Sequence, residues 1–176
     1  MKNILNELRK DLKQIVKDEF SGENTKRQYI KKAPEGLFLS EKHLIEKYFN
    51  NTKGKLLDLG CGTERTTILL YEKGYSVIRV DIVPKMIENA KKIASEKNFD
   101  IDYRVGDATE LEFEDDMFDS VFFSNQGWTQ IPRKENRIKV LKEIRRILKN
   151  NGILIFTSHT RHLFSKHFFC FLVCKK

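Results

Sequence analysis

The fold is set by the stretch Leu56-Leu57-Asp58-Leu59-Gly60-Cys61-Gly62-Thr63, in which a short apolar run ends in two closely spaced glycines. The run from Lys55 to Leu59 is typical of a buried β-strand. Glycines directly after a strand permit a backbone with positive φ and let a ligand approach without a Cβ in the way. The stretch therefore predicts a strand followed by a tight turn that receives a ligand.

Downstream of this turn, short apolar strands alternate with helices. Strands are expected at 75–80, 101–105, 118–124 and 153–157, and helices at 65–73, at 84–98 and from Pro132 to a turn at Asn151-Gly152. Such alternation indicates an α/β fold, a Rossmann-like parallel sheet with helices on both faces, in which ligands bind beyond the carboxyl ends of the strands. The buried face of the last helix is expected to carry Ile138, Leu141, Ile144 and Leu148.

Upstream of the turn, an amphipathic helix is predicted over residues 2–19. A polar connection follows, and then a second helix that Ser40 can cap. The chain is accordingly divided into an N-terminal helical segment that packs on or caps the site, a ligand-binding domain, and an apolar and basic tail, at residues 1–53, 54–160 and 161–176.

Composition limits the classes to which the protein can belong. The 176 residues suffice for one domain with a buried core, and no window reaches the roughly 18 apolar residues of a membrane span. The three cysteines follow no disulfide framework, which favours a reduced, cytoplasmic setting. The net charge is +8, but residues 54–160 carry 17 basic and 17 acidic side chains. A nucleic-acid partner is therefore not favoured, and no membrane partner is expected.

The glycine spacing separates two classes of nucleotide-binding turn. A dinucleotide site uses G-x-G-x-x-G, and Arg65 occupies the sixth position here, so that fingerprint fails. The stretch instead resembles the first motif of class I methyltransferases that use S-adenosylmethionine (SAM). The resemblance implies that Asp58 holds the methionine amino group and that Gly60-Cys61-Gly62 passes under the methionine and ribose. Glu64 replaces the family's third glycine and is expected to crowd the ligand, so Glu64→Gly is predicted to tighten SAM binding.

Two further segments resemble motifs of the same family. The resemblance implies that Asp81 accepts both ribose hydroxyls, that Ile82 packs on the adenine ring, and that Asp107 and Ala108 bind the adenine edge. An NAD site would also place an acid at Asp81, but it does not require the Asp107-Ala108 pair. Each aspartate by itself equally fits a helix cap or a turn. Ser124, at the end of the fourth expected strand, completes the predicted cofactor site.

The methyl acceptor is expected beyond the fourth strand. Asn125, Gln126 and Trp128 are predicted to orient it, although Trp128 equally fits a core or lid position. Tyr29, from the N-terminal segment, is predicted to close over the site, although it equally fits a surface aromatic. His159 is a candidate catalytic base and Asn125 a second catalytic candidate.

The C-terminal end is expected to be shorter than the family's seven-stranded fold, with at most one further apolar segment after the fifth strand. His167, Cys170 and Cys174 would share one side of a helix there, but no fourth ligand is evident, so no metal site is predicted. The resemblance implies a SAM-dependent methyltransferase with a small-molecule acceptor. The alternatives are a SAM-binding module without turnover, an RNA or protein methyltransferase, and an NAD-linked enzyme.

Overall fold

A computed structural model describes residues 2–22, 24–25, 27, 36–49, 53–60, 62, 64–124, 127–159 and 169–176. For residues 2–11, 159 and 169–175 it describes the backbone alone.

Six strands form one sheet in the order β3-β2-β1-β4-β5-β6. They are β1 (Lys55–Leu59), β2 (Ser76–Asp81), β3 (Asp102–Val105), β4 (Phe118–Phe123), β5 (Leu148–His159) and β6 (Phe169–Lys175). The first five strands run parallel, and β6 runs antiparallel to β5. The strand order reverses between β1 and β4, where sheets of this kind bind their ligands. The predicted Rossmann-like α/β fold is confirmed.

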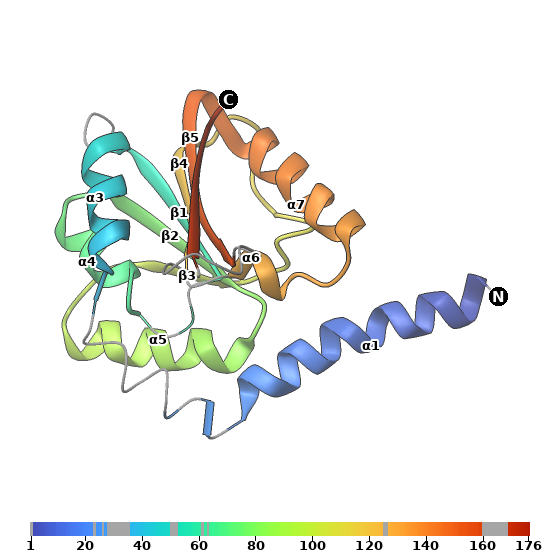
Figure 1. The fold of residues 1–176 in the computed structure, drawn as a ribbon. Coiled ribbons are helices and arrows are strands. Elements are labelled where there is room, and N and C mark those ends of the chain that lie inside the picture. Colours follow the sequence, from blue (N-terminus) through green and yellow to red (C-terminus); the bar gives the residue numbers. More distant parts are fainter. Residues whose placement is uncertain are drawn as a thin grey trace.

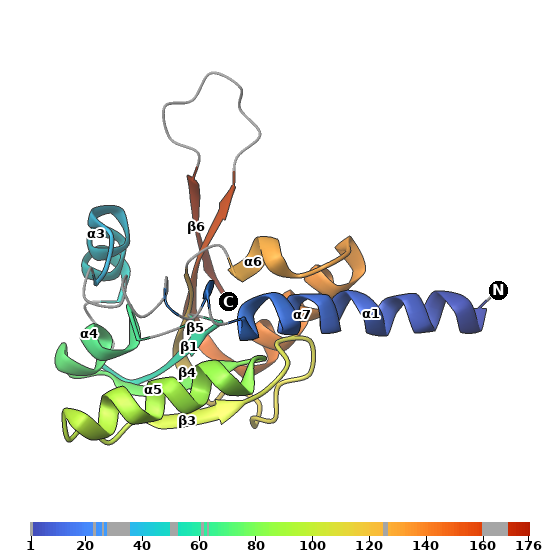
Figure 2. The same cartoon turned by 90° about the horizontal axis from the view of Figure 1, so that it is seen from below.

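Helices cover both faces of this sheet (Figure 1). Their bounds are α1 (Lys2–Ser21), α3 (Leu39–Tyr48), α4 (Thr67–Glu72), α5 (Pro84–Glu96), α6 (Gly127–Gln130) and α7 (Lys134–Ile147). One face carries α3, α4 and α5, and the other carries α7. The N-terminal end of α1 extends beyond the body of the molecule, whereas its C-terminal end contacts α5 (Figures 1 and 2).

The core is divided by the sheet into layers that match these faces. Leu56, Phe122 and Ile155 point from the strands toward Ile45 of α3 and Leu70 of α4. On the opposite face, a second cluster joins the strands to α7 through Val140, Ile144 and Ile147. Alternate strand residues thus serve opposite layers, as expected for a sheet that is covered on both sides.

The packing of α7 differs from the prediction. Ile138 and Leu141 are 43% and 39% exposed, because the face on the sheet is Val140, Ile144 and Ile147. Both rows have helical spacing, and only docking on the sheet selects between them.

Several predicted boundaries also shift. The helix ends at Ile147 and β5 begins at Leu148, so the expected turn at Asn151 and Gly152 is an irregularity inside β5, where Asn151 has a φ of 67°. Ser40 lies inside α3 rather than at its cap, because the carboxylate of Glu41 accepts the backbone N–H of Phe38.

The end of the predicted tail forms a strand rather than the expected helix. Strand β6 pairs with β5 from Phe169 opposite His159 to Lys175 opposite Ile153. Cys170 and Cys174 therefore belong to this strand, and His167 lies outside the described residues.

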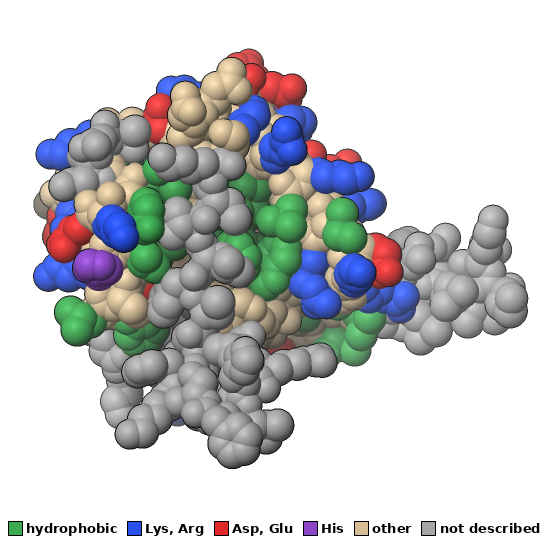
Figure 3. Space-filling model, turned by 45° about the horizontal axis from the view of Figure 1, so that its top comes forward, with side chains coloured by type: hydrophobic (Ala, Val, Ile, Leu, Met, Phe, Trp, Pro, Cys, Tyr) green, Lys and Arg blue, Asp and Glu red, His purple; other side chains and the backbone are tan. Residues whose placement is uncertain are grey.

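Basic and acidic side chains are interspersed on the face shown in Figure 3. Within the described part of the chain, no helix has the length and apolar character needed to cross a membrane.

Candidate cofactor site

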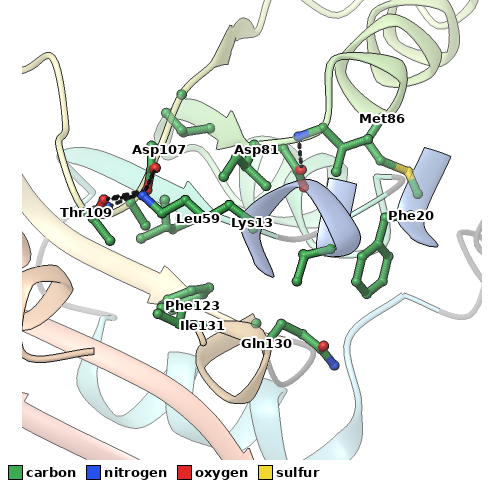
Figure 4. Close-up of a pocket in the computed structure, with 18 of the residues that line it drawn as sticks. Lys13, Phe20, Leu59, Asp81, Met86, Asp107, Thr109, Phe123, Gln130 and Ile131 are labelled. Atoms are coloured by element: carbon green, nitrogen blue, oxygen red, sulfur yellow. Dashed lines mark hydrogen bonds and ion pairs between the residues drawn. The ribbon is translucent and has the colours of Figure 1, made fainter. Parts of the chain in front are cut away.

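A pocket opens beyond the carboxyl ends of β1, β2 and β3 (Figure 4). One wall consists of the strand ends and the loops that follow them, and the opposite wall comes from β4, α6 and the segment after it. The C-terminal half of α1 contributes a third side. Its lining includes Lys13, Val16, Phe20, Leu59, Gly60, Gly62, Asp81, Ile82, Val83, Met86, Gly106, Asp107, Ala108, Thr109, Phe123, Gln130, Ile131 and Pro132.

The glycine turn brings the backbone to the floor of this pocket. Gly60 and Gly62 have φ values of 63° and 67°, a region that side chains disfavour. A Cβ on Gly60 would lie 2.8 Å from Cε2 of Phe123, so the turn also lacks room for a side chain there. The N–H of Gly60 donates to the carbonyl of Val80 at 2.8 Å, which fixes the turn to β2.

Asp58 lies beneath the turn and does not line the pocket. Its side chain is fully buried, and Oδ2 accepts the hydroxyls of Thr66 and Thr67 at 2.7 Å each. Oδ1 has no hydrogen-bond partner among the described residues. A buried carboxylate oxygen is costly to leave unpaired, so a hydrogen-bond donor to Oδ1 is expected.

Asp81 ends β2 and lines the pocket wall (Figure 4). Its carboxylate accepts the N–H of Gly62 at 3.3 Å and the N–H of Val83 at 2.9 Å. Burial raises the pKa of the Asp81 carboxyl above its usual value, and the neighbouring Arg79 guanidinium acts in the opposite direction. Ile82, the next residue, lines the same pocket.

Asp107 follows β3 on the same wall, next to Ala108. Its Oδ2 accepts Nζ of Lys13 at 2.5 Å, and its Oδ1 accepts the N–H and the hydroxyl of Thr109 at 2.8 Å each. Burial raises the pKa of Asp107, but the hydrogen bonds from Lys13 and Thr109 outweigh it and hold the pKa below its usual value. An ammonium group from α1 thus contacts the carboxylate that sequence reasoning assigns to adenine.

Of the remaining predicted residues, three lie in the described part of the chain and four lie outside it. Ser124 is fully buried outside the pocket lining, and Trp128 packs on Phe156 with ring centroids 5.0 Å apart. The structure describes only the backbone of His159, at the end of β5. Cys61, Asn125, Gln126 and Tyr29 lie outside the described residues.

The structure also places charged residues that sequence reasoning did not assign. Arg79 is fully buried in β2 and forms an ion pair with Glu64, and Arg65 pairs with the buried Glu41 of α3. Glu64 is 2% exposed and does not line the pocket, so the expectation that it crowds a ligand is wrong. A lone arginine within the apolar strand 76–81 is the sequence signal that points to a buried partner.

Comparison with known proteins defines the class. The family model described as "Methyltransferase domain" matches residues 57–156, which run from β1 into β5. The chain belongs to this methyltransferase family, and its fold is that of the class I, SAM-dependent methyltransferases.

The similar proteins are longer than this chain, and each alignment covers only part of them. The Bacillus subtilis protein named "Putative methyltransferase YqeM" is 33% identical over 108 residues, which are 61% of this chain and 43% of that protein. The demethylmenaquinone methyltransferase of Staphylococcus epidermidis is 34% identical over 119 residues, 65% of this chain and 46% of that protein. A solved SAM-dependent methyltransferase from Methanosarcina mazei is 26% identical with a TM-score of 0.65, over 74% of this chain and 62% of that chain. The chain thus spans less than half of the two curated relatives.

The residues present fit SAM. The backbone of Gly60 and Gly62 lines the pocket without a side chain, two carboxylates line one wall, and the buried Oδ1 of Asp58 has no partner among the described residues. These features match a ligand that carries hydroxyl and amino donors.

Proposed function

We propose that this protein transfers the methyl group of SAM to a small-molecule acceptor. The observation that carries the proposal is the pairing of Asp81 and Asp107 on one pocket wall, at the ends of neighbouring parallel strands and above a glycine turn. Two carboxylates so arranged suit the two ends of an adenosine, with hydroxyls at one end and an amino group at the other.

Each residue of the site has a proposed part in holding SAM. Asp81 accepts the ribose hydroxyls, Ile82 packs on the adenine ring, and Asp107 with Ala108 binds the adenine edge. Asp58 accepts the methionine amino group through Oδ1, which has no partner among the described residues. The glycines let the backbone pass close beneath the ligand.

The chemistry requires placement more than acid or base groups. Bound SAM would supply a methyl group on a sulfonium: a lone pair of the acceptor would form a bond to the methyl carbon in line as the bond from that carbon to sulfur breaks, and S-adenosylhomocysteine would leave. Holding the two reactants in line and excluding water supply much of the acceleration. His159 and Asn125 stay proposed as catalytic candidates, and Gln126, Trp128 and Tyr29 as acceptor contacts.

The lining supports an acceptor with an apolar body. The wall opposite Asp81 and Asp107 carries Phe123 and Ile131, with Gln130 as its polar side chain (Figure 4). Such a surface binds rings or aliphatic groups and orients them through few polar contacts. The acceptor named for the Staphylococcus epidermidis relative, a demethylmenaquinone, is of this chemical kind.

Calorimetry with SAM and S-adenosylhomocysteine tests the proposal. We expect saturable binding of both, and we expect Asp81→Ala to weaken it by roughly tenfold or more, because two charge-assisted hydrogen bonds are lost. Asp102 is an exposed residue of β3, the strand next to the one that carries Asp81. The variant Asp102→Asn therefore serves as the control and should not change the affinity. An absence of binding by the unmodified protein at millimolar SAM would contradict the proposed function.

A second candidate function is SAM binding without turnover. The contact of Lys13 with Asp107 bears on the affinity alone, because a cation there competes with the adenine amino group for the carboxylate. Transfer of label from radiolabelled SAM to any pool of small molecules would exclude this second function.

A further inference from the structure

The segment after the glycine turn is anchored by four consecutive buried polar residues. Together these anchors reach three strands and one helix. Glu64 reaches β2 and β3, Arg65 reaches α3, and Thr66 and Thr67 both reach Asp58 on β1. Four such residues in a row at the end of a turn indicate that its position is strongly constrained.

The partners of Glu64 lie side by side across the sheet. Arg79 stands between Asp58 and Tyr103 in the register of the three strands, and its guanidinium lies 5.8 Å from the centroid of the Tyr103 ring. Glu64 contacts Arg79 in an ion pair and accepts the hydroxyl of Tyr103 at 2.8 Å. Because Arg79 and Glu64 are both buried, each compensates part of the other's charge, and Arg79 also acts on the carboxyl of Asp81.

The backbone of Glu64 shows why this anchor matters for the turn. Its φ is 59°, in the left-handed region where glycine is favoured and other residues are strained. The side-chain contacts with Arg79 and Tyr103 hold this conformation. They also direct the carboxylate away from the pocket, since Glu64 is absent from its lining.

The turn is connected to β2 at two points. Gly62 donates its N–H to Asp81, and Glu64, two residues later, pairs with Arg79, two residues before Asp81 on the same strand. Together these contacts close a short ring between the turn and β2. Movement of Glu64 would therefore displace the Gly62 N–H and with it the carboxylate that faces the pocket.

We propose that Glu64 and Arg79 are positioning residues for SAM, a role that rests on the proposed function. Neither residue lines the pocket. The pair holds the glycine turn in the conformation that receives the ribose and methionine. Its carboxylate comes from Glu64, at the position where the family has its third glycine.

A pair of single variants and their combination test this role. Glu64→Gly should weaken SAM binding by about tenfold and lower the Tm by roughly 10 °C, because it removes the carboxylate that forms an ion pair with the buried Arg79. Adding Arg79→Met removes that cation and should restore most of the Tm but not the affinity. A double variant with the affinity of the unmodified protein would show a purely structural pair, and tighter binding by Glu64→Gly alone would also overturn the proposal.

Milder variants keep the test valid if Glu64→Gly does not fold. Tyr103→Phe removes only the hydroxyl that donates to Glu64 and should weaken SAM binding by about threefold. Glu64→Gln keeps the length and the hydrogen-bonding reach of the side chain and should remain within about threefold of the unmodified protein. Asp102→Asn, which breaks an exposed ion pair on the same strand as Tyr103, is the matched control without an effect.

The outcomes separate the two proposals. If the unmodified protein does not bind SAM, the proposed function and the positioning role both fall. If it binds SAM and Tyr103→Phe and Glu64→Gly bind equally well, only the positioning role falls.

Discussion

Glu64 and Gly60 share a left-handed backbone within the same turn, with φ values of 59° and 63°. For Glu64, relief of this strain by glycine is worth roughly 1–3 kcal/mol, whereas a buried cation left without its partner costs about 3–5 kcal/mol. The cost of losing the ion pair is larger than the gain from the relieved backbone strain. Glu64→Gly is therefore expected to destabilise the protein, the reverse of what the family pattern suggests.

Gly60 offers a prediction at the same scale, with Gly74 as a matched control. Both have positive φ, but a Cβ on Gly60 meets Phe123 at 2.8 Å, whereas a Cβ on Gly74 meets only the flexible end of Lys53 at 3.9 Å. Gly60→Ala should lower the free energy of unfolding by about 3 kcal/mol and Gly74→Ala by about 1 kcal/mol. Equal losses in urea unfolding would show that the contact with Phe123 is unimportant.

At the scale of elements, α1 is the part of the molecule with the most direct effect on the pocket. Lys13 donates to Asp107 and to Thr109, and Val16 and Phe20 line the same space. Lys13→Met removes the cation that competes for Asp107 and keeps an apolar side chain. We expect it to tighten SAM binding by roughly threefold to tenfold.

Lys17→Met, one turn further along α1 and outside the pocket lining, is the control for Lys13→Met and should leave the affinity unchanged. Weaker binding by Lys13→Met would mean that Lys13 helps to hold the cofactor rather than competing with it.

The same ion pair predicts a pH dependence. The folded pKa of Asp107 lies below its ordinary value of 3.8, so the pair contributes stability above that value and loses it as the pH falls through the lowered pKa. The difference in Tm between the unmodified protein and Lys13→Met should be present at neutral pH and decrease as the pH falls below 3.8 and through the lowered pKa. The raised pKa values of Glu64 and Asp81 act with the opposite sign but equally in both proteins, so they cancel in this difference. A difference that persists at low pH would contradict the ion-pair explanation.

At the scale of the whole molecule, ligand binding should appear as stability. A ligand at about one hundred times its Kd stabilises the folded state by roughly 2.7 kcal/mol, which corresponds to a rise in Tm of about 5–10 °C for a chain of this size. We expect this rise with SAM and not with NADH, and Asp81→Ala should reduce it at the same SAM concentration. A rise with NADH instead would support the NAD-linked alternative.

The order of strands and helices is determined by the sequence alone. Apolar runs, the glycine turn and Pro84 at the start of α5 are local signals, because each depends on a few neighbouring residues. For the same reason, the sequence alone places Asp81 and Asp107 at or directly after strand ends. Parallel strands then bring these ends to one edge of the sheet.

Only the tertiary structure decided which side chains meet. Lys13 and Asp107 are 94 positions apart, and the Glu64–Arg79 pair depends on the register between β1, β2 and β3. The face of α7 and the pairing of β6 with β5 were likewise selected by docking, since more than one apolar row and more than one secondary structure suited those segments. The sequence pattern gives the hydrophobic periodicity of each helix or strand and the residues that end it. Contacts between distant elements depend instead on how their surfaces pack.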